Sequence, residues 1–190
     1  MTNETDQELI ARAQRGDQDA FAELVRRHHS GVLALCRSML GDDAAADDAA
    51  QDVFLKTYRS LKGFRGDAAL STWLYRVASN RCLDILRAAG RAKTQSLDAL
   101  LEDEGERVQA LVAQEGPERS AADAELVKRV LAALPEGYRL ILTLREVSGL
   151  TYDELCETLD CSLDAVKARL RRARLEFAEK LRHIEGSDRV

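Results

Sequence analysis

The chain has 190 residues, of which 45% are hydrophobic and 32% charged, and its formal net charge is −5. This hydrophobic content is enough to bury a core, and no apolar run approaches the roughly 20 residues that span a bilayer, so the composition excludes a disordered chain and predicts no membrane insertion. With no basic and apolar leader at the N-terminus, two prolines and few β-branched runs, the sequence predicts a cytoplasmic, all-α protein.

The first two predicted helices lie before Gly41. A short helix over 6–15 ends at Gly16, a residue that suits the left-handed position after a helix. Asp17 or Asp19 can cap the second helix, which continues to Gly41. Apolar residues recur in it every three or four positions, so we expect this helix to bury one face.

A third helix is predicted over 44–61, and its two faces differ in chemistry. Ala46, Ala50 and Val53 fall on one face, which predicts that this face is buried. Leu55 falls on the opposite, acidic face, where it is either a stray surface leucine or an interface anchor within a polar rim. We favour the interface, and its outward residues are Asp48, Gln51, Asp52 and Leu55.

Ser71 is a plausible N-cap for a fourth helix, over 72–90. Three aromatic residues lie among five arginines between Phe64 and Arg91, a pattern that suits single-stranded nucleic acid, because bases stack on rings while phosphates pair with arginine. Burial of Trp73 in a helical core is the alternative, and both hold if one edge of the ring stays exposed. The side chains favoured for nucleic acid are Phe64, Arg65, Trp73, Arg76 and Asn80.

Charge is arranged in blocks, whereas a protein that is merely soluble intersperses its signs. Residues 41–58 hold five acids and one base, 59–93 hold eight bases and two acids, and 94–137 hold ten acids and four bases. Weak periodicity and a Gly-Pro pair predict a flexible acidic linker within the last of these blocks. The predicted organisation is a domain at 1–92, the linker at 93–122 and a second domain at 123–190.

The second domain contains a predicted helix-turn-helix, preceded by helices over 124–134 and 135–146. Thr151 and Glu154 form a T-x-x-E capping box at the head of its first, short helix. A tight turn follows, and the long second helix ends near Ile184. A short helix, a tight turn and a longer helix are typical of a DNA-binding motif.

The long helix is dense in cations. Ser162 can cap it, and no acid lies between Lys167 and Arg174, although like charges at these spacings oppose each other. A solvated face is the alternative, but solvated faces usually intersperse glutamate. A polyanion that neutralises the cations explains the pattern better, and the small residues Ala165 and Ala168 would let the helix enter a major groove.

Two stretches resemble a known family, the bacterial extracytoplasmic-function sigma factors of the sigma-70 superfamily. Their region 2 is similar to DDAAQDVFLKTYRSLKGFRGDAALSTWLYRVASNRCLDILR, and their region 4 is similar to LPEGYRLILTLREVSGLTYDELCETLDCSLDAVKARLRRAR. The resemblance implies a region 2 helical bundle and a region 4 helix-turn-helix in a subunit of RNA polymerase that is not an enzyme by itself and needs no cofactor or metal. Asp164 and Ala165 stand where the family often has Gly-Thr, which leaves the −35 sequence preference open.

The resemblance also implies partners. The acidic face of the third helix would dock on the β′ coiled coil of core RNA polymerase, with the β flap as a second contact. Region 2 would open the −10 element of promoter DNA, region 4 would read the −35 element as duplex, and an anti-sigma factor would hold the protein inactive. The implied contacts are Asp48, Gln51, Asp52 and Leu55 for polymerase; Phe64, Arg65, Trp73, Arg76 and Asn80 for −10; and Ser162, Lys167, Arg169, Arg171 and Arg172 for −35.

Two other classes of protein have less support. An autonomous helix-turn-helix regulator would bind duplex DNA without polymerase, but the βαβ pattern of a receiver domain is missing from the sequence. An enzyme is disfavoured because the sequence has no P-loop and no glycine-rich nucleotide turn. The four cysteines are expected as core thiols, and a zinc site that pairs Cys36 with His28 or His29 fits the known ligand spacings poorly.

Overall fold

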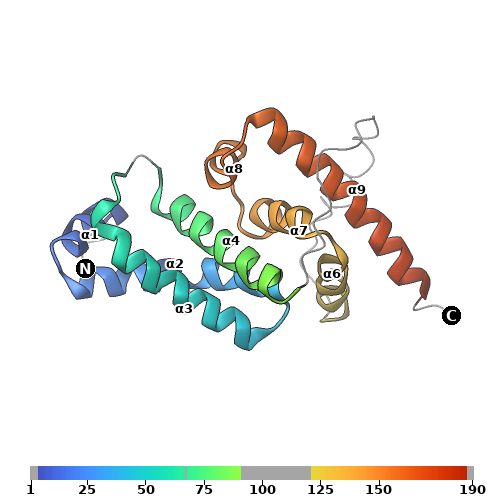
Figure 1. The fold of residues 1–190 in the computed structure, drawn as a ribbon, viewed down its shortest axis with the longest axis horizontal. Coiled ribbons are helices and arrows are strands. Elements are labelled where there is room, and N and C mark those ends of the chain that lie inside the picture. Colours follow the sequence, from blue (N-terminus) through green and yellow to red (C-terminus); the bar gives the residue numbers. More distant parts are fainter. Residues whose placement is uncertain (1–3, 67, 91–120, 188–190) are drawn as a thin grey trace.

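The computed structural model describes residues 4–66, 68–90 and 121–187 (Figure 1). Within these ranges the chain is helical and contains no strand, which confirms the predicted all-α class. Before the gap at 91–120 lie α1 (Asp6–Gln14), α2 (Gln18–Leu40), α3 (Asp43–Ser60) and α4 (Leu70–Ala88). After it lie α6 (Ala121–Ala133), α7 (Glu136–Leu142), α8 (Tyr152–Leu159) and α9 (Leu163–Ser187).

Helix α2 is the centre of the first bundle, and α1, α3 and α4 pack around it (Figure 1). Most of its apolar stripe is buried as predicted, with Cys36 and Met39 fully enclosed, whereas Phe21 and Val25 are half-buried. The thiols of Cys36 and Cys82 meet in this core, where their hydrogen bond and burial raise the pKa of Cys82 far above its usual range. These two cysteines are core thiols as expected, whereas Cys156 and Cys161 are only half-buried.

Short-range capping sets most helix ends of this bundle where the sequence predicts them. Thr5 and Glu8 form a capping box at the start of α1. Asp17 accepts hydrogen bonds from two backbone N–H groups in the first turn of α2. Gly41 follows α2 in the left-handed region, at a φ of 70°.

The ends of α4 differ from the prediction. Ser71 is not the N-cap, because Ala69 occupies that position and offers no side-chain cap. The helix starts at Leu70, whose buried side chain packs into the core and stabilises a start that lacks a capping group. At the other end α4 stops at Ala88, and Gly90 has a φ of 66°.

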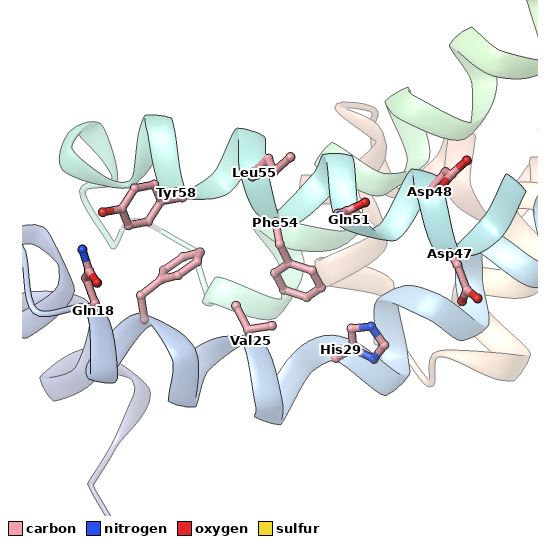
Figure 2. Close-up of a pocket in the computed structure, with 10 residues that line it drawn as sticks. Gln18, Val25, His29, Asp47, Asp48, Gln51, Phe54, Leu55 and Tyr58 are labelled. Carbon is pink, nitrogen blue, oxygen red and sulfur yellow. The ribbon is translucent and has the colours of Figure 1, made fainter. Parts of the chain in front are cut away.

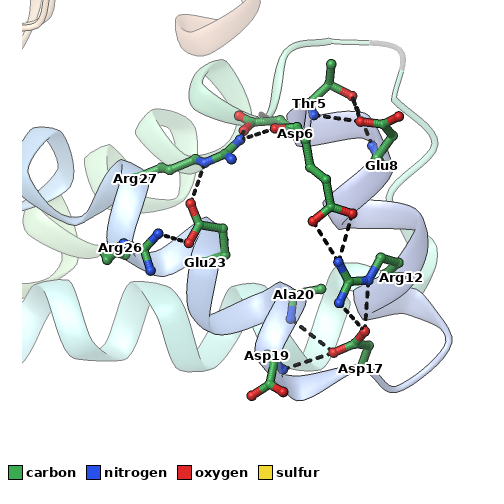
Figure 3. A network of polar contacts seen from close by, with 11 residues as sticks. Thr5, Asp6, Glu8, Arg12, Asp17, Asp19, Ala20, Glu23, Arg26 and Arg27 are labelled. Carbon is green, nitrogen blue, oxygen red and sulfur yellow. Dashed lines mark hydrogen bonds and ion pairs between the residues drawn. The ribbon is translucent and has the colours of Figure 1, made fainter. Parts of the chain in front are cut away.

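A polar network fastens α1 to α2 (Figure 3). The Arg12 guanidinium lies between two carboxylates: Nη1 donates to the oxygens of Glu4 at 2.7 and 2.8 Å, and Nε donates to Asp17 at 2.9 Å. Arg27 of α2 donates to the carboxylate of Asp6, at the start of α1, at 3.0 Å. The network therefore ties both ends of α1 to the helix at the centre of the bundle.

This network should make the fold acid-sensitive. Burial alone would raise the pKa of Asp6, but hydrogen bonds from His28 and Arg27 lower it below 3.8. A backbone hydrogen bond and the Arg12 guanidinium lower the pKa of Asp17. A carboxylate whose pKa is lower in the folded than in the unfolded chain stabilises the fold at higher pH, and its contribution disappears as the pH falls through the folded pKa. We expect the free energy of unfolding, measured by urea titration, to fall between about pH 5 and pH 2.

Asp17→Asn should make this pH dependence shallower, because the variant has one carboxylate fewer with a lowered pKa. Asp19→Asn is the matched control, since it removes the same charge from a side chain that accepts none of these hydrogen bonds. If both substitutions changed the pH dependence equally, net charge rather than the network would set the acid sensitivity.

Helices α6 to α9 form a second bundle, in which α8 and α9 are the predicted helix-turn-helix. Thr151 and Glu154 form the predicted capping box. Asp160 ends α8 in the left-handed conformation, at φ 51° and ψ 52°. Ser162 caps α9, and its Oγ accepts a hydrogen bond from the N–H of Ala165 at 3.3 Å. The side chains fully enclosed between the two helices are Leu155, Val166 and Leu170.

The two bundles pack against each other, α4 against α8 and α2 against α6 and α7 (Figure 1). Arg139 of α7 fastens this contact, because Nη1 donates to the carbonyl of Met39 in α2 at 2.7 Å and Nε donates to the carbonyl of Leu131 in α6 at 2.7 Å. One guanidinium therefore satisfies carbonyls at the ends of two helices. The expected linker at 93–122 lies outside the described residues except for its last two positions, which belong to α6.

None of the described helices is long and apolar enough to cross a membrane. The described residues also contain no group of three His, Cys, Asp or Glu side chains placed to hold a metal ion. The residues considered for zinc have other neighbours: Cys36 meets Cys82, His28 Nε2 lies 2.6 Å from Asp6, and the ring of His29 stacks on Phe54 at 6.0 Å.

Candidate functional site

An apolar groove with an acidic rim lies between α2 and α3 (Figure 2). Its volume is about 870 Å³, and Leu55 and Tyr58 at its edge are 48% and 47% exposed. Large apolar side chains that stay exposed within a polar rim are typical of a protein–protein interface. The apolar lining also includes Phe21, Val25 and Phe54, and the polar lining includes Asp47, Asp48 and Gln51.

The structure brings together three of the four residues predicted for this face, since Asp48, Gln51 and Leu55 all line the groove. Asp52 does not line it. Its carboxylate lies 2.6 Å from Nη2 and 2.9 Å from Nε of Arg81 in α4. In this structure Asp52 therefore joins α3 to α4, a pairing that the sequence alone did not predict.

Sequence reasoning missed the aromatic part of the groove. Tyr58 packs edge-on against Phe21 of α2, with ring centroids 4.9 Å apart and an angle of 63° between the rings. Tyr58 follows Leu55 by three residues and so shares its side of α3, which helical spacing could have indicated. Phe21 could not be found in this way, because it belongs to a stripe on α2 whose spacing predicts burial.

A second cavity, of about 660 Å³, lies between the loop before α4 and the helix α8. The rings of Phe64 and Trp73 line it together, with centroids 5.0 Å apart and 34° between their planes. Trp73 is half-buried: its ring packs against the core and keeps an open surface, the condition under which core packing and a nucleic-acid contact are compatible. Arg65 and Arg76 are exposed at the same cavity, and Asn80 is exposed one turn further along α4, outside the lining.

Helix α8 provides the opposite wall of this second cavity. Two carboxylates lie on that wall, Glu157 and Asp160, across from Arg65 and Arg76. Opposite charges across the gap favour the packed arrangement of the two bundles.

Gln14 of α1 fixes the loop that forms the cavity. Its Nε2 donates to the carbonyl of Leu61 at 3.0 Å and to the carbonyl of Phe64 at 2.9 Å. These partners lie 47 and 50 residues away along the chain, so no local pattern could have indicated the contact. The position of the Phe64 ring therefore depends on α1.

The outward face of α9 is basic, as predicted. Lys167 is exposed, and neither it nor Arg169 pairs with a carboxylate in the part of the chain that the structure describes. Arg174 differs, because its Nη2 lies 2.8 Å from the carboxylate of Glu146, in the turn after α7, and its side chain is largely buried. Arg171 and Arg172 are half-buried. Ser162 is exposed at the start of this face, and its hydroxyl hydrogen remains available as a donor while Oγ accepts the capping bond.

Comparison with known families places both bundles in one class of protein. Residues 24–92, which include α3 and α4, match the family Sigma-70 region 2. Residues 124–177, which include the helix-turn-helix, match the family Sigma-70, region 4. The fold is therefore that of a sigma-70-type transcription initiation factor.

Similarity to individual proteins identifies the family within this class. The RNA polymerase sigma-H factor of Pseudomonas aeruginosa is 41% identical over 181 residues, which cover 92% of each chain. The ECF RNA polymerase sigma-E factor of Escherichia coli K12 is 40% identical over 184 residues, which cover 95% of this chain and 96% of the relative. The chain belongs to the extracytoplasmic-function sigma factors, which are alternative sigma factors.

Solved structures agree with this family. CnrH, solved in complex with the cytosolic domain of CnrY, superimposes with a TM-score of 0.70 at 27% identity, over 95% of this chain and 99% of that chain. The sigma factor RpoE of Bartonella quintana, solved with the anti-sigma factor NepR, has a TM-score of 0.64 at 23% identity, over 85% of this chain and 96% of that chain. The second similarity supports the fold alone.

Proposed function

We propose that this chain binds bacterial core RNA polymerase through the groove between α2 and α3 and directs the enzyme to promoters, without being an enzyme itself. The observation that carries this proposal is the exposure of Leu55 and Tyr58 beside the carboxylate of Asp48. A groove of this kind suits an amphipathic helix with basic flanks, such as one helix of the β′ coiled coil. Family membership supports the same partner and a cytoplasmic location, where the polymerase acts.

We infer that the second cavity holds the single-stranded −10 element. Bases would stack on Phe64 and Trp73, and Arg65 and Arg76 would pair with phosphates, while the exposed amide of Asn80 would read a base edge. Stacking contributes about 1–3 kcal/mol per base. That gain is of the size needed to offset the few kcal/mol that extruding a base from the duplex costs.

Gln14→Leu tests the −10 assignment. The substitution leaves two loop carbonyls without their donor, at about 1 kcal/mol for each lost hydrogen bond, so the Phe64 ring should be less fixed. We expect slower and less complete promoter opening, measured with a fluorescent base analogue in the −10 element, at unchanged affinity for core polymerase. Arg15→Leu is the control, since it also places a leucine on the end of α1, at an exposed residue that does not contact the loop. Wild-type opening by the Gln14 variant would separate this loop from DNA melting.

We propose that α9 reads the −35 element as duplex, through Ser162 and the cations Lys167, Arg169, Arg171 and Arg172. An exposed basic face at the start of the second helix of a helix-turn-helix supports this role. Residues 1–92 and 123–190 would then be the two promoter-binding domains joined by the acidic segment 93–122, with the β flap as a further contact of the second domain.

We also propose that an anti-sigma factor regulates this chain. The support is that the structural neighbours CnrH and RpoE were solved with CnrY and with the anti-sigma factor NepR, respectively. In the described arrangement α8 already lies against the −10 cavity, so a partner that bridges the two bundles would keep that cavity covered.

Reconstitution with core polymerase tests the function as a whole. The purified chain and bacterial core RNA polymerase are combined on a library of promoter fragments, and run-off transcripts are sequenced. Initiation that requires both components supports the proposal and gives the promoter motif. If the chain formed no complex with core polymerase and held duplex DNA alone at physiological salt, it would instead be an autonomous DNA-binding regulator.

A further inference from the structure

The outward, basic side of α9 contains one acidic residue among its cations. Asp164, Lys167, Ala168 and Arg171 follow one another at spacings of three and four, so they share one side of the helix. Val166 and its neighbours on the opposite side are buried in the motif's core, which turns the side of Asp164 outward. Between Leu163 and Leu175 there is no other acid.

The carboxylate of Asp164 has no polar partner in the part of the chain that is described. It is exposed and forms no hydrogen bond or ion pair with any described residue. Capping of α9 is performed by Ser162, whose Oγ accepts from the N–H of Ala165. A carboxylate in the first turn does favour the helix through the macrodipole. That interaction does not explain why the acid lies in the middle of the basic side of the helix.

Bound DNA would change the interactions that are open to the Asp164 carboxylate. When a helix enters the major groove, its first residues meet base edges while flanking cations meet phosphates. A carboxylate brought within a Debye length of the phosphates is repelled by them. The repulsion is offset only where the carboxylate accepts a hydrogen bond from a base, and in the major groove the donors are the amino groups of cytosine and adenine.

Guanine and thymine present acceptors to the same position. Guanine offers N7 and O6, and thymine offers O4, so a carboxylate opposite either base faces oxygen or nitrogen lone pairs and remains unpaired. The small side chain of Ala168, one turn further along the same side, leaves room for the helix to approach the bases. Asp164 can therefore both favour one kind of base and disfavour the other.

We propose that Asp164 determines part of the −35 sequence: it accepts a hydrogen bond from the amino group of a cytosine or adenine in the major groove and excludes guanine and thymine from that position of the contacted strand. This inference rests on the proposed role of α9 in −35 recognition. Asp164 would select the class of base, whereas the cations would set the position and the affinity of the helix on DNA.

Sequencing of transcripts from a promoter library tests the inference. Holoenzyme is assembled from core polymerase and the full chain as wild type, Asp164→Ala, Asp164→Asn or Glu179→Gln, and each initiates on promoters with a randomised −35 element. Wild type should prefer an amino base at one position by about tenfold. Asp164→Ala should lose the preference at that position alone. Asp164→Asn should shift it toward adenine, since an amide pairs with both N6 and N7.

Glu179→Gln is the matched control, because it removes one negative charge from an exposed site further along the same helix. It should reproduce the wild-type base profile. If Asp164→Ala raised initiation on all promoters equally and left the profile unchanged, Asp164 would act only through its charge and the inference would be wrong. If wild type enriched no −35 motif at all, the proposed role of α9 would fail and this inference with it.

Discussion

Leu55→Arg should strongly weaken binding to core RNA polymerase. The side chain is 48% exposed at the edge of the α2–α3 groove, so the fold does not depend on it. Binding to polymerase does depend on it if Leu55 is an anchor of the interface. Removal of such an anchor typically costs 2 kcal/mol or more, so affinity should fall by at least about thirtyfold. The measurement is a fluorescence titration of labelled protein with core polymerase, with circular dichroism to confirm the helical fold.

Leu163→Arg is the matched control for this experiment. It places the same charge on a leucine that is 39% exposed, but on α9 rather than in the groove. Affinity for core polymerase should stay within a factor of about two, the usual range for a surface change remote from an interface. Equal losses for both variants would contradict the assignment of the groove.

Asp52 should be tested differently, because its carboxylate pairs with Arg81. In Asp52→Arg, two guanidinium groups would face each other across α3 and α4, so lost binding could result from a local rearrangement. The exchange of both charges, Asp52→Arg with Arg81→Asp, restores an opposite pair. The exposed pair itself contributes at most about 1 kcal/mol.

Lys167→Ala combined with Arg169→Ala should weaken binding to −35 duplex and make it less dependent on salt. Each cation that neutralises a phosphate contributes about 0.9 to the slope of log K against log salt concentration, so the double variant should reduce that slope by about 1.8. Binding of holoenzyme to a labelled promoter, measured by anisotropy from 50 to 200 mM salt, gives the slope directly.

The control removes the same charge from the same helix. Lys180→Ala with Arg182→Ala lies about 20 Å further along α9, at a rise of 1.5 Å per residue, and Lys180 already pairs with Glu176 at 3.4 Å. This variant should keep the wild-type slope. A slope that fell equally in both variants would indicate a general effect of net charge and remove Lys167 and Arg169 from the DNA interface.

Much of this fold follows from interactions within a few residues along the chain. The capping box of Thr151 and Glu154, the left-handed turn at Asp160 and the stop at Gly41 are local, and each was predictable. Helical spacing likewise predicted the outward position of Leu55 correctly. The predicted start of α4 was wrong, because there tertiary packing decides: the helix begins at the buried Leu70 and not after Ser71.

The candidate sites show the same division. Residues that share one helix face, such as Asp48 and Leu55, could be grouped from spacing alone. Contacts between helices could not: the bond from Gln14 to the Phe64 carbonyl spans 50 residues, and the pair of Asp52 with Arg81 spans 29. Spacing has no information about which helices become neighbours, so these partners required the structure.

The bond between Arg139 and the Met39 carbonyl joins two parts of the chain that are synthesised at different times. Its two ends are 100 residues apart, so at the usual rate of translation the donor leaves the ribosome roughly 5–20 s after the acceptor. N-terminal domains generally fold first, so α1 to α4 should assemble before α7 and α8 exist. Every new molecule therefore passes through a stage in which the ring surfaces of Phe64 and Trp73 are open, and the wall with Glu157 and Asp160 closes over them only as synthesis nears its end.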